Sequence, residues 1–421
     1  MASHFDTSFL IRPLEPLFFG RPQSFTAGDA HHSHSEFPPS PMTFQGLIRT
    51  RLLSAARPPL NLDDWSPAAR KERESLIGEP DALPEGWQIE GPLPATLARA
   101  KGNPPGEPTL APWLPAPLFL LKPGPSQHRK RTEPVRAQVF ASAPEGPDQL
   151  KAALNDLDSD WLLTGDPRNS SNRPVAGWLG PKNLVLALSG EDLKDWDPSQ
   201  HAEQLPPFVK FEPQAGIALD DPRKRPGAAR QGMLYQQVCL RFEESAGLWG
   251  RLKGPVDSRI PSDALTQAAG TAGRKRRLVA FSGSPPLSQD WKALLQGRYL
   301  EKADDQGYFW LVLVSPLQRD GQRHPAVPPL PNGVNLKFRS ALLGSSLTYG
   351  GFSMATGKSR PNLPFHPPGS AWLFQLSGGD QESRRSALKL LHNGHLLGDR
   401  HLARFGFGHT LVGVGPRRNT P

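Results

Sequence analysis

The chain has 421 residues and a formal net charge of +9, and 37% of its residues are hydrophobic. This length suits about two to three domains, each large enough to bury a core. The only cysteine, Cys239, excludes an internal disulfide and a cysteine-ligated zinc site.

The excess of positive charge favours a polyanionic partner such as nucleic acid, because lysine and arginine displace counterions from phosphates. No signal-peptide pattern opens the chain, and the longest apolar run, residues 308–314, is too short to span a bilayer. We therefore expect a cytoplasmic protein with no membrane partner. The 48 prolines and 40 glycines indicate a folded protein with long irregular loops.

The first predicted elements are a strand over residues 8–14 and a helix that starts at Pro41, with Ser40 as its N-cap. Apolar residues at helical spacing along this helix are Phe44, Leu47, Ile48 and Leu52. Residues 57–115 are rich in proline and weakly periodic, so we expect an insertion or loop region there.

The middle of the chain contains shorter patterns. We predict strands over residues 116–122 and 182–188, a helix over residues 149–157 and a linker over residues 195–207.

A long hairpin is predicted after this linker. Two strand patterns, residues 208–213 and 233–242, flank a basic turn rich in glycine and proline. The hairpin over residues 213–235 would carry Arg223, Lys224 and Arg225 at its tip.

The last third of the chain is the most regular. Its predicted strands are residues 278–281, 308–314, 371–376 and 410–414, and its predicted helices are residues 286–295 and 383–392. Helices alternate with strands whose turns suit antiparallel pairing, which favours the α+β class. Two ferredoxin-like (RRM-like) domains with long Pro/Gly-rich loop insertions fit the length. We place them at residues 1–205 and 206–421.

A glycine-rich loop over residues 404–413 is the main candidate site. Gly406 and Gly408 would turn backbone N–H groups toward an anion, since glycine has no Cβ. The flanking side chains predicted to contact phosphates or bases are Arg400, Arg404, Phe405, Phe407 and His409. A tight turn before the last strand is the alternative interpretation.

Other clusters carry weaker signals. Basic runs occur at residues 129–131, 223–225, 274–277, 384–385 and 417–418, and we expect two of the five to contact RNA. The histidines at 31, 32 and 34 and the three Asp-Asp pairs have no partners at metal-ligand spacing. The sequence thus contains no complete catalytic set, and we expect no enzyme activity, no cofactor and no metal.

Four sequence blocks resemble RAMP-superfamily CRISPR proteins, and most closely the third subunit of the type III-B (Cmr) RNA-silencing complex. The blocks are residues 12–19 with 38–49, residues 216–220 with 232–235, residues 350–353 with 368–374, and residues 406–413. They occur in the family order and span nearly the whole chain.

The resemblance implies two RRM-like domains and a non-catalytic, RNA-binding role in antiviral defence. The family holds the repeat-derived tag at the 5′ end of the CRISPR RNA and docks on the large polymerase-like subunit. The implied partners also include adjacent backbone RAMP subunits and, indirectly, the target RNA. The hairpin would act as a wedge where the tag ends, and Arg49 on the first helix would bind a phosphate.

Two other functions stay open at this point. A CRISPR-precursor endoribonuclease of the same superfamily would need a general base and a general acid, for which the nearby histidines are His4, His31, His32 and His34. A nucleotide-binding metabolic enzyme would instead use the glycine-rich loop for a phosphate.

Overall fold

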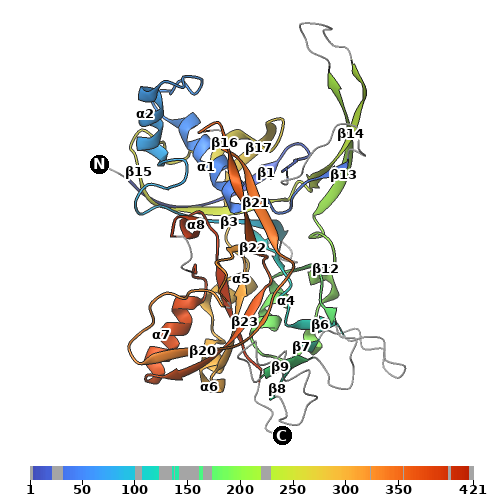
Figure 1. Cartoon of the computed structure of the whole chain (residues 1–421), viewed down its shortest axis with the longest axis vertical. Helices are drawn as coiled ribbons and strands as arrows, with labels where there is room; N and C mark the ends of the chain where they lie inside the picture. The colour runs from blue at the N-terminus through green and yellow to red at the C-terminus, as the bar shows by residue number, and fades with distance from the viewer. Residues whose placement is uncertain are drawn as a thin grey trace.

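The computed structural model of the chain describes residues 3–20, 32–99, 107–122, 135–136, 138–141, 161–164, 173–219, 229–322, 324–353, 355–396 and 400–416. Two units are stacked along the long axis of the molecule, and a two-stranded hairpin projects from the upper one (Figure 1). Helices and mostly antiparallel sheets are mixed along the chain, which confirms the predicted α+β class.

A six-stranded antiparallel sheet forms the centre of the upper unit. Its strand order is β16-β17-β1-β15-β3-β4, so β1 pairs with β15 on one side and β17 on the other. The strands are β1 (Ser3–Pro13), β3 (Gln88–Arg99), β4 (Pro108–Pro112), β15 (Ala246–Val256), β16 (Gln267–Ala272) and β17 (Arg277–Gly283). Two distant stretches of sequence therefore interleave in one sheet.

Helix α1 (Pro41–Ala55) packs on one face of this sheet. The hydroxyl of Ser40 accepts a hydrogen bond from the backbone N–H of Thr43 at 3.2 Å, which confirms the predicted N-cap. Phe44 is fully buried and lies against Phe9 of β1, with ring centroids 6.2 Å apart. The predicted apolar face of the helix is thus the face that contacts the sheet.

A four-stranded antiparallel sheet forms the centre of the lower unit, in the order β20-β23-β18-β24. Every residue of its inner strand β18 is buried. The strands are β18 (Tyr308–Leu313), β20 (Val334–Leu342), β23 (Ala371–Gly378) and β24 (Thr410–Val414). Helices that contribute buried side chains to this core are α4 (Pro181–Leu188), α5 (Gln289–Gln296), α6 (Leu300–Gln306) and α7 (Gln381–Leu391).

The projecting hairpin belongs to a three-stranded sheet in the order β13-β14-β2. Strands β13 (Val209–Leu219) and β14 (Ala229–Phe242) pair antiparallel, and β2 (His32–His34) runs parallel to β14. The predicted long hairpin is confirmed, while its tip, residues 220–228, lies outside the described residues.

The remaining elements are shorter or lie at the edges of the two units. The helices are α2 (Pro67–Ile77), η1 (Leu193–Asp195), η2 (Pro198–Gln200) and α8 (Arg400–Arg404). The strands of small sheets are β5 (Leu114–Pro115), β6 (Leu120–Lys122), β7 (Val135–Arg136), β8 (Gln138–Ala141), β9 (Trp161–Thr164), β10 (Arg173–Pro174), β11 (Trp178–Leu179), β12 (His201–Ala202), β19 (Leu317–Gln318), β21 (Leu347–Ser353) and β22 (Lys358–His366).

The predicted insertion over residues 57–115 is corrected by the structure. This region contains α2 and β4, and it supplies β3 to the upper sheet. Gly91, Pro92 and Pro94 lie inside β3 and are residues that ordinarily argue against a strand interior. They concealed the strand from pattern analysis.

The predicted strand over residues 182–188 is instead helix α4, which begins with Pro181 in its first turn. Short apolar runs do not distinguish a buried strand from a buried helix. The predicted helix over residues 149–157 lies outside the described residues.

The predicted domain boundary between residues 205 and 206 does not match the sheet topology. Strands β15, β16 and β17 follow that point in sequence, yet they pair in the sheet that contains β1 and β3. In the sequence, the hairpin lies between β3 and β15, which both belong to the upper sheet. It is therefore an insertion in the upper unit. None of the described helices is long and apolar enough to cross a membrane.

A buried ion pair joins two helices of the lower unit. The carboxylate of Asp304 on α6 has 1% side-chain exposure and accepts a hydrogen bond from Arg384 Nε of α7 at 2.6 Å. Arg385 of α7 lies 3.7 Å from its other oxygen and 3.2 Å from Glu301. The basic run at residues 384–385 therefore holds α7 against α6. This role accounts for both arginines without a contact to RNA.

Replacing Asp304 by Ala should lower the free energy of unfolding by about 3 kcal/mol, because two arginines would lose their buried counter-charge. Its exposed neighbour Asp305 is the matched control, and Asp305→Ala should change stability by less than about 0.5 kcal/mol. Urea denaturation followed by tryptophan fluorescence measures both. Equal effects of the two substitutions would contradict the role assigned to this ion pair.

Candidate RNA interface

The glycine-rich loop lies between α8 and β24, where the two units meet. Its amides donate within the chain: Gly406 N to Ala403 O at 3.1 Å, and Gly408 N to Pro316 O at 2.8 Å. Phe407 N donates to Leu402 O at 3.1 Å. A phosphate cradle needs free N–H groups. We therefore correct the prediction that Gly406 and Gly408 bind RNA through their amides. For the same reason, the loop cannot serve as the phosphate site of a nucleotide-binding enzyme.

The two phenylalanines of the loop are core residues. Phe405 is 1% exposed and Phe407 is 3% exposed. The ring of Phe407 packs between Phe365 and Tyr349, with centroids at 5.2 and 6.2 Å. A base cannot stack on a ring whose surroundings are already filled, so the predicted stacking role of both phenylalanines is also corrected.

Arg404, which precedes the loop, is turned toward the protein. Arg404 donates a hydrogen bond from Nε to the carbonyl oxygen of Trp87 at 2.9 Å, and its guanidinium also donates to Pro84 O. These bonds tie α8 to the turn that precedes β3 and remove Arg404 from the predicted phosphate ligands. Arg400 begins α8, and its side chain lies outside the described residues.

Arg49 is likewise a structural residue. It is 7% exposed and donates to the carbonyl oxygens of Gly78 at 2.7 Å and Glu79 at 2.6 Å. Burial, followed by the nearby guanidinium of Arg360, lowers the pKa of Arg49 to about 10. Its predicted contact with a phosphate is corrected, because the side chain faces the end of α2 and is shielded from a polyanion.

Three histidines pack around the same loop, and of these His392 and His409 are buried while His395 is half-buried. His392 accepts a hydrogen bond from Val412 N at Nδ1 and contacts Leu294 O through Nε2 at 2.8 Å, an arrangement that suits only the neutral ring. The rings of His395 and His409 stack with centroids 5.0 Å apart. Burial lowers the pKa of all three, most strongly for His409, which also lies near the other two. His409 is thus a core residue, which corrects its predicted contact with RNA.

The projecting hairpin differs from the loop because much of it stands clear of the core (Figure 1). Its cross-strand register runs from Val209 opposite Phe242 to Leu219 opposite Ala229. The predicted tip cations Arg223, Lys224 and Arg225 follow β13 in the sequence and lie outside the described residues, so their role remains a prediction.

The two faces of the hairpin root carry different side chains. On one face, Gln214 accepts a hydrogen bond from Arg277 of β17 at 3.1 Å, and Cys239 and Gln237 are buried. On the other face, Leu240 is buried, whereas Phe211 opposite it is 45% exposed. The ring of Phe211 meets that of His34 of β2 at right angles, with centroids 6.3 Å apart.

Phe211 has no distinguishing signal in the sequence. Its alternation with Lys210 and Glu212 is typical of any half-buried strand, and only the three-stranded pairing decides which side chains of the hairpin stay exposed.

A basic turn between β16 and β17 lies next to this root. Arg274, Lys275 and Arg276 are exposed, and the backbone of Arg274 donates to Phe18 O at 2.8 Å. Among the five predicted basic runs, this is one whose residues the structure describes and whose first three side chains are exposed. The runs at residues 129–131 and 417–418 lie outside the described residues.

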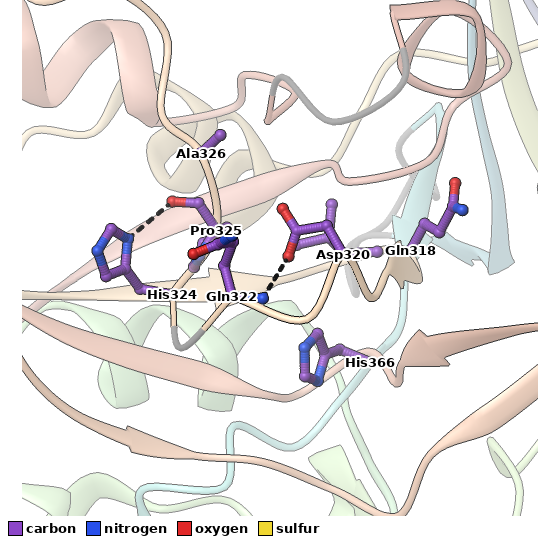
Figure 2. Close-up of a pocket in the computed structure, with 8 residues that line it drawn as sticks. Gln318, Asp320, Gln322, His324, Pro325, Ala326 and His366 are labelled. Atoms are coloured by element: carbon purple, nitrogen blue, oxygen red, sulfur yellow. Dashed lines mark hydrogen bonds between the residues drawn. The ribbon is translucent and has the colours of Figure 1, made fainter. Parts of the chain in front are cut away.

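A small pocket is lined by residues between Leu317 and Ala326 and by His366. Figure 2 shows its lining, which includes Asp320, His324 and His366. Asp320 accepts a hydrogen bond from Gln322 N at 2.9 Å, and His324 Nδ1 contacts Pro325 O at 3.2 Å. These groups bond within their own turn, and no arrangement for acid–base catalysis is evident in this pocket. The described ranges contain no group of three or more His, Cys, Asp or Glu residues able to hold a metal ion.

A Cβ on Gly406 should break the contact between the units. Its φ is +99°, and an added Cβ would lie 2.8 Å from the carbonyl oxygen of Gly91. Gly406→Ala should therefore cost about 3 kcal/mol of stability, from backbone strain plus a clash with backbone. Gly351 is the matched control, because its φ is +104° and an added Cβ meets no described atom within 4 Å. Gly351→Ala should cost about 1 kcal/mol, and equal losses in denaturant unfolding would refute the packing role.

The histidine cluster predicts that stability falls in mild acid. The folded-state pKa values lie below the unfolded value near 6.5, so the unfolded chain binds protons first as the pH drops. Each such histidine contributes a slope of up to about 1.4 kcal/mol per pH unit below pH 6.5. Unfolding curves between pH 7 and pH 5 measure the slope, which His409→Asn should reduce. An unchanged slope in that variant would exclude His409 as a source.

Two solved structures are similar to the chain at low sequence identity. A chain of a type III-B Cmr-beta complex bound to cognate target RNA and AMPPnP is 14% identical, with 87% of this chain and 86% of that chain covered and a TM-score of 0.40. A chain of the Csm3–Csm4 subcomplex of a type III-A complex is 9% identical, with 89% and 93% covered and a TM-score of 0.31. No curated protein matches the chain.

A family sequence model provides the decisive match. The model described as CRISPR-associated protein (Cas_Cmr3) matches residues 9–415, which is nearly the whole chain. This agrees with the four sequence blocks that resemble the third Cmr subunit. The chain belongs to the Cas_Cmr3 family of CRISPR-associated proteins.

Proposed function

We propose that the chain is a non-catalytic RNA-binding subunit of a type III-B CRISPR effector complex. It holds the 5′ repeat-derived tag of the CRISPR RNA, docks on the large polymerase-like subunit and adjoins the backbone RAMP subunits in the cytoplasm. It would contact target RNA only indirectly. Membership in the Cas_Cmr3 family supports this proposal, together with the net charge of +9.

The observation that carries the proposal is the hairpin. Strands β13 and β14 extend well beyond the upper unit (Figure 1), and the sequence between them carries Arg223, Lys224 and Arg225. A projecting arm with a cationic end can bind phosphates and position RNA without reading its sequence. The glycine-rich loop and Arg49, in contrast, are committed to packing within the chain.

The strand orders support an inference of two ferredoxin-like units. In chain order, β1, β3, β15 and β17 are the four strands of the first unit, and they lie in the sheet as 4-1-3-2. The strands β18, β20, β23 and β24 lie in the same 4-1-3-2 order in the second sheet. Helix α1 follows the first strand of one unit, and α7 precedes the fourth strand of the other.

RNA binding by the purified chain tests the proposal. An RNA with the repeat-derived tag should bind more tightly than the same RNA without it, with an affinity that falls as salt rises. Replacing Arg223, Lys224 and Arg225 by Ala should lower the slope of log affinity against log salt by up to about 2, from roughly 0.7 per phosphate contact. Fluorescence anisotropy at several salt concentrations measures both effects.

A control variant separates this site from general charge. The control set of three exposed cations on the lower unit is Arg298, Lys302 and Lys389. Replacing this set by Ala removes the same charge and should leave the slope nearly unchanged. Equal affinity for tagged and untagged RNA would refute the tag assignment, and cleavage of repeat RNA on a gel would favour the endoribonuclease alternative.

A further inference from the structure

The aromatic side chains exposed on the described surface differ in what surrounds them. Trp65, Phe211 and Phe352 are the large aromatic residues among the exposed hydrophobic side chains. The guanidinium of Arg73 lies over the ring of Trp65, 5.1 Å from its centroid. No ring contact to Phe352 occurs among the described residues, and isolated exposed apolar side chains are ordinary. Phe211 is the exposed ring that has a second ring beside it.

The geometry of Phe211 and His34 suits a flat ligand. Their planes are at 89°, so the contact occupies at most one of the four ring faces of the pair. His34 is exposed as well, and it is held on β2 by parallel pairing with Val238 of β14. The strand pairing thus fixes both backbones and leaves ring surface open to solvent.

The nearest neighbours of the pair on the same face are uncharged. The neighbours on the same face are the buried Leu240, directly opposite Phe211, together with Val238 and the exposed Pro213 and Ala215. The ring is therefore covered on the β14 side and open along β13. The carboxylate of Glu212 points to the opposite face, where Arg241 pairs with it. Exposed Lys210, paired with Arg241, also points to that opposite face. An open ring on a face without a described carboxylate, in a chain of net charge +9, fits a nucleic acid strand.

We propose that Phe211, braced by His34, is a stacking platform for one base of single-stranded RNA at the root of the hairpin. The proposal rests on the proposed function, because RNA held by the basic hairpin tip is what brings a base to this face. Stacking on a ring face is tolerant of sequence, since every base has a π surface. The platform therefore holds the strand without selecting a particular base.

Two RNA probes separate base stacking from charge. One is a fluorescent oligouridylate of about 12 nucleotides, and the other is a strand of the same length and charge built from abasic ribose units. Phe211→Ala should weaken binding of oligouridylate about tenfold, within the range measured for loss of one stacked base. It should leave the affinity for the abasic strand unchanged, and the salt slope should be the same as in the unchanged protein.

Matched variants control for folding and for exposed phenylalanine in general. Phe211→Trp keeps an aromatic face and should retain the affinity, whereas Phe211→Leu keeps an apolar side chain and should lose it. Phe352→Ala removes the more exposed ring, 58% against 45%, and should change affinity less than about twofold. Thermal unfolding of each variant confirms that it is folded.

The outcomes distinguish this inference from the function on which it rests. If the unchanged protein binds neither probe nor tagged RNA, both proposals fail. If it binds RNA and Phe211→Ala binds both probes equally well, the platform alone is refuted. Loss of association with another subunit of the complex at unchanged RNA affinity would also overturn the inference, and would show that this face contacts protein.

Discussion

The contact between the backbones of Gly406 and Gly91 is the constraint on which the arrangement of the two units depends. A side chain at 406 would collide with the carbonyl oxygen of Gly91, and one at 91 would come within 2.6 Å of Trp249 O. Phe44 of α1 packs against the sheet at Gly250, where an added Cβ would lie 2.5 Å from the Phe44 ring. The glycines thus let a loop of the lower unit, two strands of the upper sheet and a helix pack in succession at backbone distance.

This packing explains why so many arginines are unavailable to RNA. Arg49 and Arg404 donate to backbone carbonyls at the ends of elements, and Arg384 neutralises a buried carboxylate. Guanidinium groups suit these positions because their several N–H donors can satisfy carbonyls that would otherwise be buried without partners. The net charge of the chain therefore overstates the charge that a nucleic acid can reach. The cations that remain candidates are those of the hairpin tip and of the turn between β16 and β17.

The hairpin is separated from this packing by its place in the topology. It is part of the connection between β3 and β15, which are neighbours in the upper sheet, so the connection can lengthen without altering either strand. One face of its root is anchored by Arg277, and the other carries Phe211 and His34. Val209, Leu240 and Phe242 of the root belong to the core, whereas exposed side chains such as Phe211 do not, and for that reason we propose the contacts with RNA on this arm.

The sequence alone determined the class of the fold, the capped helix at Ser40, the hairpin, four strands of the last third (β17, β18, β23 and β24) and, through four short blocks, the family. These features depend on local periodicity, on turn chemistry or on motif order, all of which a chain displays before it folds. Tertiary structure decided the rest. The glycine and prolines within β3 hide the strand in the sequence. Its pairing with β15 in the folded chain shows that the segment is a strand. The glycine-rich loop has the composition of an anion site, yet its amides donate to carbonyls distant in sequence or across the turn. Composition reports which groups a loop can offer, and only packing against other segments decides whether those groups are already used.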